Sequence, residues 1–214
     1  MLRTLTAGAA MMAAFAIPGQ ALAGPAPLPN DNMMIIDVVS ANGSGCKKGT
    51  AVLAVAPDNT AFTIAYSTYT ALVGPDAGPT DFRKNCQISL DIKVPSGFTY
   101  AIAGTDHRGY AKLAHGAFAH EATNYYFQGN SQTVRLKHTF KGPFDNTWQK
   151  TDNVGIASLS FRPCGERRYL NINTELQVGR GNSSPKATNL ISMDSTDTAL
   201  KTVYRVVWKK CGRH

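Results

Sequence analysis

The chain has 214 residues, of which 43% are apolar and only 17% are charged, and its formal net charge is +8. This composition is unlike that of a disordered chain or a long helix, and the length is sufficient to bury a core without a metal to hold it. The basic residues are dispersed in pairs and accompany no nucleic-acid-binding motif. Nucleic acid is therefore not expected as a partner, and an anionic polymer, membrane surface or acidic protein fits the charge better.

The first 23 residues have the features of a secretory signal peptide. Arg3 supplies a positive start, residues 5–17 form a short apolar run, and Ala21-Leu22-Ala23 forms a small-residue cleavage site. The apolar run is too short for a transmembrane helix, which needs about 20 apolar residues. We therefore predict a secreted, extracellular protein with no transmembrane segment, cleaved after Ala23. The Pro-rich residues 24–32 should form an extended leader, and residues 33–214 a single domain.

Strands are expected from residue 33 onward, first at 33–40, 50–56 and 60–67. The clearest one covers residues 86–94, where apolar side chains at even positions alternate with polar side chains at odd positions. Pro95-Ser96-Gly97 should then turn the chain into a second alternating run at 98–103. The sequence therefore predicts a β-hairpin over residues 86–103.

The same alternation of apolar and polar side chains returns in the second half of the chain. It predicts strands at 134–140, 154–162, 170–178 and 203–208. Loops are expected at 74–79 and 179–186, where Gly, Pro, Ser and Asn accumulate. Alternation of this kind is typical of antiparallel sheets with one face in water. We therefore expect an all-β, jelly-roll-like sandwich of two antiparallel sheets with roughly ten strands.

Four cysteines lie beyond the signal peptide: Cys46, Cys86, Cys164 and Cys211. An even number in an exported chain predicts two disulfides, for which three connectivities exist. We favour Cys46–Cys86 with Cys164–Cys211, because each bond then stays within one half of the chain. Zinc is the rival interpretation, but no C-x-x-C pair is present.

Nine short segments, spread over nearly the whole mature chain, form a recognisable set that includes all four cysteines. They are Asn42-Gly-Ser-Gly-Cys46, Pro57-Asp-Asn-Thr-Ala-Phe62, Asp81-Phe-Arg-Lys-Asn-Cys86, Phe98-Thr-Tyr-Ala-Ile-Ala103, Tyr125-Tyr-Phe-Gln-Gly129, Pro163-Cys-Gly165, Leu170-Asn-Ile-Asn-Thr-Glu-Leu176, Met193-Asp-Ser-Thr-Asp197 and Trp208-Lys-Lys-Cys211. Taken together, they resemble the secreted domain-of-unknown-function family numbered 4360, found in bacteria and fungi. The resemblance implies a secreted, β-rich single domain and brings no activity and no catalytic residue.

No familiar catalytic motif is present, and we expect no enzyme, no cofactor and no bound metal. The best metal candidate combines His115, His120 and Glu121 with the upstream Asp106 and His107, but surface histidines in a turn-rich segment are the simpler interpretation. Carboxylate pairs for acid–base chemistry would be Asp194 with Asp197, or Glu166 with Glu175. Residues 194–197 could also supply calcium ligands, although they lack the pattern of an EF-hand and suit a turn better.

The most interesting binding candidate is the polar face of the strand at 170–178. Asn171, Asn173, Glu175 and Gln177 are four consecutive outward side chains that could hydrogen-bond a ligand. Tyr125 and Tyr126 could supply a stacking surface beside them. The simpler interpretations are a solvated strand face and aromatic side chains in the core. Two sequons, at Asn42 and Asn182, permit N-glycosylation in a eukaryotic host.

These features lead to one main functional prediction and two alternatives. The main prediction is a secreted, non-enzymatic binding protein whose ligand is a cell-wall or other extracellular polysaccharide. The first alternative is a protein-binding role such as inhibition of a secreted protease by the exposed loop at 74–80. A hydrolase is the second.

Overall fold

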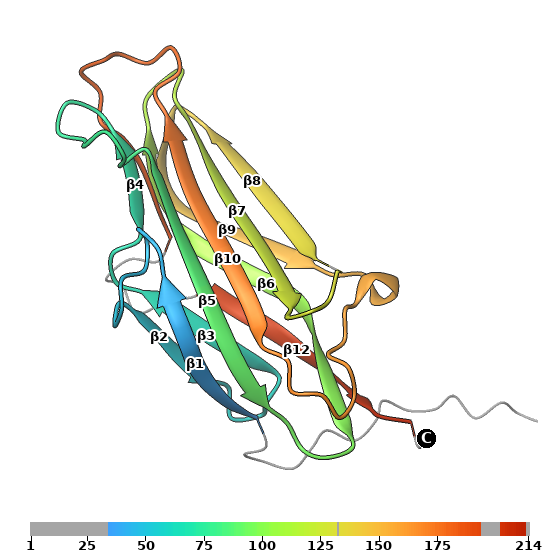
Figure 1. Cartoon of the computed structure of the whole chain (residues 1–214). Helices are drawn as coiled ribbons and strands as arrows, with labels where there is room; N and C mark the ends of the chain where they lie inside the picture. Colours follow the sequence, from blue (N-terminus) through green and yellow to red (C-terminus); the bar gives the residue numbers. More distant parts are fainter. Residues whose placement is uncertain (1–33, 132, 194–201, 213–214) are drawn as a thin grey trace, which may run out of the picture.

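The computed structural model describes residues 34–131, 133–193 and 202–212, which form two antiparallel β-sheets facing each other (Figure 1). The predicted all-β, two-sheet fold is confirmed, with twelve strands in the described residues. The described part contains no helix that is long and apolar enough to cross a bilayer. The signal peptide at 1–23, the leader at 24–32 and the carboxylates Asp194 and Asp197 lie outside the described residues.

The first sheet has five strands in the order β1-β5-β10-β7-β8, so β1 and β8 are its edges (Figure 1). We refer to it as sheet A. Its strands are β1 (Ile35–Asn42), β5 (Arg83–Lys93), β7 (Phe118–Phe127), β8 (Val134–Lys141) and β10 (Leu170–Gly179).

The second sheet, sheet B, has the order β2-β3-β12-β6-β11-β4, and β9 pairs with the free edge of β6. The 16-residue strand β6 organises this sheet, because β12 and β11 pair along one of its edges and β9 along the other. The strands are β2 (Ala51–Val55), β3 (Ala61–Tyr66), β4 (Thr70–Val73), β6 (Phe98–Leu113), β9 (Phe144–Asn153), β11 (Asn189–Met193) and β12 (Thr202–Lys210).

The predicted hairpin over 86–103 is wrong, although both of its strands exist. β5 pairs with β1 and β10 in sheet A, whereas β6 belongs to sheet B. The turn at 94–97 therefore carries the chain from one sheet to the other. Local alternation shows that a segment is a strand, but it does not show which strand it will pair with.

The strand predicted at 154–162 is also absent. This segment holds a short 3₁₀-helix, η1 (Ile156–Ser158), within a loop, and Ile156 is 90% exposed. Only isolated backbone hydrogen bonds join the segment to β6, from Val154 N to Ala103 O and from Arg162 N to Tyr100 O. The apolar residues of this segment therefore do not belong to a strand with a continuous ladder of backbone hydrogen bonds.

Four strands were not predicted: β4, β7, β9 and β11. β7 alternates without a fault between half-buried and buried positions, but its inward side includes Glu121 and Thr123 while its outward side includes Phe118 and Tyr126. In β9, the inward side likewise includes charged residues. In β7 and β9, therefore, the inward positions are not all apolar. Because of this, apolar and polar residues alternate only weakly in their sequences.

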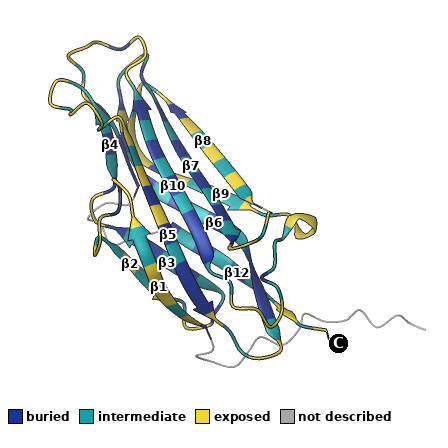
Figure 2. Ribbon diagram, viewed as in Figure 1, coloured by how far each residue is buried: buried dark blue, intermediate teal, exposed yellow. Residues whose placement is uncertain are grey.

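The core lies between the two sheets and is formed by the buried side chains of both inner faces. Figure 2 shows the buried positions in dark blue along the central strands β5, β10 and β7 of sheet A. As predicted, Cys86, Ile88, Leu90 and Ile92 of β5 all point into the core. Asp91 departs from the predicted pattern, since it lies on the polar side of β5 but is only 3% exposed. The guanidinium of Arg167 covers it and hydrogen-bonds the Asp91 carboxylate, which lowers the pKa of that carboxyl group.

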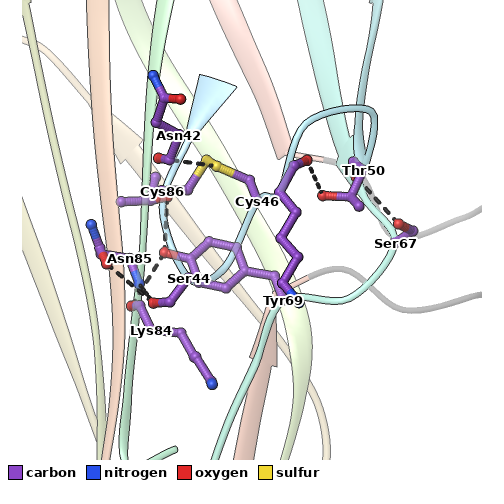
Figure 3. The surroundings of a disulfide bond; sticks show 11 residues. Asn42, Ser44, Cys46, Thr50, Ser67, Tyr69, Lys84, Asn85 and Cys86 are labelled. Atoms are coloured by element: carbon purple, nitrogen blue, oxygen red, sulfur yellow. Dashed lines mark hydrogen bonds between the residues drawn. A yellow bond between two sulfur atoms is a disulfide. The ribbon is translucent and has the colours of Figure 1, made fainter. Parts of the chain in front are cut away.

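Both favoured disulfides are present, Cys46–Cys86 and Cys164–Cys211, so the zinc interpretation of the cysteines is wrong. Cys46 follows β1, and its bond to Cys86 fastens the β1–β2 loop to β5 (Figure 3). The glycines of this loop are needed there. A Cβ at Gly45 would lie 2.1 Å from the ring of Tyr69, and Gly43 has a φ of 138° and packs on the backbone of Asn85.

Candidate functional site

The outer side of sheet A carries the polar face predicted for β10. Its inward side chains are the buried Leu170, Ile172, Leu176 and Val178. Asn171, Asn173, Glu175 and Gln177 therefore point outward together, because side chains alternate along a strand. The structure thus places all four predicted residues on one surface, at the middle strand of the sheet.

Strand register extends this surface into a row that crosses all five strands. Asn42 pairs with Gln87, Gln87 with Asn173, Asn173 with Asn124, and Asn124 with Arg135. Directly paired residues have Cα atoms about 4.5–5.5 Å apart, so these are neighbouring side chains. We call these five residues the amide row. None of its four amide side chains hydrogen-bonds another side chain in the part of the chain that the structure describes.

The rows on either side complete the surface. In one, Asn171 lies between Ser89 and Tyr126, and the Ser89 hydroxyl donates a hydrogen bond of 2.7 Å to Asn171 Oδ1. Asn171 is only 9% exposed, whereas Tyr126 is half-buried. In the other, Glu175 lies between Asn85 and Ala122 and forms an ion pair with Arg83.

An open cleft of about 320 Å³ follows the amide row over four of the five strands. The short side chain of Ala122 leaves space in the cleft beside Glu175. The cleft offers amide donors and acceptors at its centre and guanidinium groups at Arg83 and Arg135. Such a site can hydrogen-bond a ligand rich in hydroxyl groups. The residues that line it are Arg83, Asn85, Cys86, Gln87, Ala122, Thr123, Asn124, Arg135, Asn173, Thr174 and Glu175.

Tyr125 does not belong to this surface, so its assignment to a stacking pair is wrong. It lies on the inner side of β7 with 5% exposure, and burial raises the pKa of its hydroxyl. Only Tyr126 reaches the outer face. The two adjacent tyrosines could not share a face, because consecutive residues in a strand point to opposite sides.

The predicted metal candidate is divided among separate surfaces. His115 is exposed in the turn before β7, His120 lies on the outer side of β7, and Asp106 forms an ion pair with Arg205 on sheet B. Only His107 and Glu121 come together, inside the sandwich. Among residues 34–131, 133–193 and 202–212, no group of three or more His, Cys, Asp or Glu side chains is placed to hold a metal ion.

His107 and Glu121 belong to an interior acid–histidine cluster with His138 and Asp152, which the sequence did not suggest. His107 Nδ1 lies 3.7 Å from Glu121 Oε1, and His138 Nε2 lies 3.9 Å from Glu121 Oε2. His138 Nε2 also hydrogen-bonds Asp152 Oδ2 at 2.8 Å. The cluster therefore joins β6 and β9 of sheet B to β7 and β8 of sheet A.

Burial controls the charges of this cluster. His107 and Glu121 are both 0% exposed, while the side chains of His138 and Asp152 are 17% and 19% exposed. Burial raises the pKa of Glu121 to about 7, against a smaller opposing effect of the hydrogen bond from Thr123. Burial also lowers the pKa of His107 to about 4, so His107 is neutral near pH 7 and its contact with Glu121 is not an ion pair.

Among the remaining candidates, Glu166, Asn182 and the loop at 74–80 lie apart from the amide row, whereas Glu175 lies beside it and Asn42 belongs to it. Glu166 forms an ion pair with Arg168 in the loop before β10, and Glu175 with Arg83 on the outer face of sheet A. The loop at 74–80 joins β4 to β5 and is held by its own hydrogen bonds, including Gly78 N to Asp81 Oδ2 at 2.8 Å. Protease binding through this loop stays a prediction. The sequon residues Asn42 and Asn182 are both exposed.

Sequence reasoning missed most of the amide row. Gln87 was expected on the polar side of its strand, but Asn42, Asn124 and Arg135 were not connected with it. These residues are far apart in the sequence and meet only through the pairing of β1, β5, β10, β7 and β8. No local pattern could have identified them as neighbours.

Comparisons with known proteins provide a family but no activity. A family model described as a domain of unknown function (DUF4360) matches residues 32–211. A protein of Arthroderma benhamiae described as an uncharacterized secreted protein is 32% identical over 188 residues, covering 88% of this chain and 75% of the relative. The secreted relative and the two disulfides agree with an extracellular location.

One solved structure with a distant likeness is the enzymatically active domain of tailspike protein 4 from bacteriophage CBA120. It is 10% identical with a TM-score of 0.27, and the match covers 84% of this chain but only 20% of that one. This chain thus spans a fifth of the tailspike chain. A likeness at this level carries no argument about fold or function.

Proposed function

Because the chain belongs to the DUF4360 family, a domain of unknown function, we propose a role from its own surface: it is a secreted, non-enzymatic protein that binds an extracellular polysaccharide. The observation that supports this most is the amide row. It combines four amide side chains, which form no side-chain hydrogen bonds within the described residues, with an open cleft across four strands of sheet A.

The chemistry of the row suits a sugar polymer. Each amide offers donors and an acceptor that can bond two neighbouring hydroxyl groups. Strands in a sheet lie about 4.7–4.9 Å apart, so the row presents such groups at regular steps across the sheet. Tyr126, in the next row, offers an aromatic face with a polar tip beside the amides. An open cleft that crosses four strands fits an extended chain better than a small compact ligand.

The proposed location follows from the N-terminus and the disulfides. We propose that residues 1–23 direct export and are removed after Ala23, so that the mature protein begins at Gly24. Sequencing the N-terminus of the protein recovered from culture medium tests this. A mature chain that still begins at Met1 would contradict it.

Binding should be measured as retention on insoluble cell walls, chitin, cellulose and glucans at increasing salt concentration. Retention that survives high salt would support recognition of the polymer, because attraction between a basic protein and an anionic surface is screened. We expect the double substitution Asn124→Ala with Asn173→Ala to weaken binding about tenfold or more, since each lost hydrogen bond contributes about 1 kcal/mol.

The matched control is Gln149→Ala, which removes an exposed amide from β9 in the other sheet. It should leave retention unchanged. If the double variant binds like the control, the amide row is not the binding surface. If the wild-type protein is retained by none of the polymers, the proposed function is wrong and protease inhibition becomes the leading hypothesis. Shortening of the bound polymer would overturn the non-enzymatic role.

A further inference from the structure

The outer side of β8 carries three cations next to the amide row. Arg135, Lys137 and Lys141 are all exposed and point outward from this edge strand. None of them forms an ion pair with a carboxylate within the described residues. Arg135 and Lys137 are two residues apart, about 6.6–6.8 Å along the strand, and Lys141 lies roughly twice as far beyond Lys137, past Thr139, so the three form a line of positive charge. We call this line the β8 basic stripe.

Other cations on the same face of sheet A are neutralised. Arg83 pairs with Glu175, Lys93 with Asp37, and Arg167 with Asp91. The basic stripe is therefore a local excess of positive charge at one edge rather than a reflection of the overall charge of the chain. Its effect reaches His120 on β7, whose pKa is lowered first by partial burial and second by the charge of Lys137.

The stripe and the amide row share Arg135. This residue pairs with Asn124 in the strand register and lines the cleft, while Lys137 pairs with Ala122 at the next step. A ligand lying along the amide row would thus end against a guanidinium group. Arginine presents a planar fork of donors that matches a carboxylate with two parallel hydrogen bonds.

We infer that the ligand of this face is an extended polysaccharide that carries carboxylate groups, as uronic acids do. The amide row binds its hydroxyl groups, and Arg135 with Lys137 binds its carboxylates. This inference rests on the proposed function of the amide row and adds the chemical class of the polymer. It assigns the carboxylates to the basic stripe, and Lys137, which lies outside the amide row, allows the two roles to be tested separately.

The experiment compares polymers that differ in charge. Polygalacturonate is tested against its methyl ester, and carboxymethyl-cellulose against hydroxyethyl-cellulose, by titration calorimetry at several salt concentrations. We expect the wild-type protein to prefer the acidic member of at least one pair. Arg135→Gln should weaken that binding about 10- to 100-fold, as a lost charged hydrogen bond does, and should reduce its salt dependence. Arg135 also belongs to the amide row, so binding of the neutral member should weaken too, but by less than about threefold, because the glutamine keeps a hydrogen-bonding amide at this position.

The control is Lys48→Gln, which removes the same charge from the loop after β1, at the opposite edge of sheet A. It should change the affinity for the acidic polymer less than twofold. Circular dichroism and thermal unfolding should match the wild type for both variants, because both side chains are exposed.

Each other outcome contradicts the inference in a distinct way. Equal binding of acidic and neutral polymers would overturn the acidic ligand and leave the polysaccharide function standing. Binding to neither would overturn both. If Arg135→Gln and Lys137→Gln behave like the Lys48 control, the stripe only protects an edge strand from pairing with other chains, a common use of charged residues at sheet edges.

Discussion

At the scale of single residues, the interior acid–histidine cluster makes a prediction about pH. Folded Glu121 keeps its proton up to a pKa of about 7, whereas the unfolded side chain loses it near the ordinary glutamate pKa of 4.5. Between these values the folded state binds more protons than the unfolded state, so this residue's contribution to stability falls as pH rises. In Glu121→Gln the group no longer titrates, and this loss disappears.

We therefore expect the stability of Glu121→Gln, relative to the wild type, to increase between about pH 4.5 and 7 and to stay constant above that range. The free energy of unfolding, measured by urea denaturation at each pH, tests this. His107→Gln is the matched control, because the contribution of His107 to stability changes with pH in the opposite direction. Folded His107 has a pKa of about 4 against 6.5 when unfolded, so this residue's contribution to stability rises with pH between those values, and the variant lacks the rise. Parallel curves for all three proteins would contradict both assignments.

At the scale of elements, the two disulfides fasten different kinds of segment. Cys46–Cys86 ties the β1–β2 loop to β5, and both of its sulfur atoms are buried. Cys164–Cys211 ties the loop before β10 to the residue after β12, and Cys164 is exposed. Their sequence separations are 40 and 47 residues, so the chain-entropy contribution is about 4 kcal/mol for each.

Because these contributions match, the difference between the two bonds should reflect burial. We expect Cys46→Ala with Cys86→Ala to lower the free energy of unfolding by about 1 kcal/mol more than Cys164→Ala with Cys211→Ala, since only the first leaves a cavity. Urea denaturation of the two double variants measures this. Equal losses would mean that the packing around Cys46 closes over the missing sulfur atoms.

Differences between individual strands explain why some were predicted from the sequence and others were not. In β5 and β10, apolar residues face the core and polar residues face water. For these strands the sequence therefore predicted both the strand and which of its sides is buried. In β7, by contrast, the core side holds Glu121 and the outer side holds Tyr126. The inward carboxylates of β7 and β9, Glu121 and Asp152, belong to the interior acid–histidine cluster. They also weaken the alternation of apolar and polar residues that would have predicted these two strands. One feature therefore accounts for both omissions.

At the scale of the whole molecule, the sandwich creates surfaces that no strand has by itself. The amide row takes one residue from each of five strands. The basic stripe can contribute to the same binding surface only because β8 lies next to β7 in the sheet. Similarly, His138 and Asp152 meet because β8 and β9 lie at adjoining edges of different sheets. The binding surface proposed here is thus a property of the sheet order.

The sequence by itself determined the fold class, the number of disulfides and the outward side of β10, whereas it favoured the observed cysteine pairing without deciding it. These depend on alternation within a strand or on simple counting, and alternation is fixed by backbone geometry whatever the strand pairs with. Only the tertiary structure decided that β5 and β6 lie in different sheets, that Asn42, Gln87, Asn173 and Asn124 form one row, and that Glu121 is buried beside two histidines. The physical reason is that strand pairing joins residues far apart in the chain and is selected by the packing of the whole core, which leaves no trace in any short stretch of sequence.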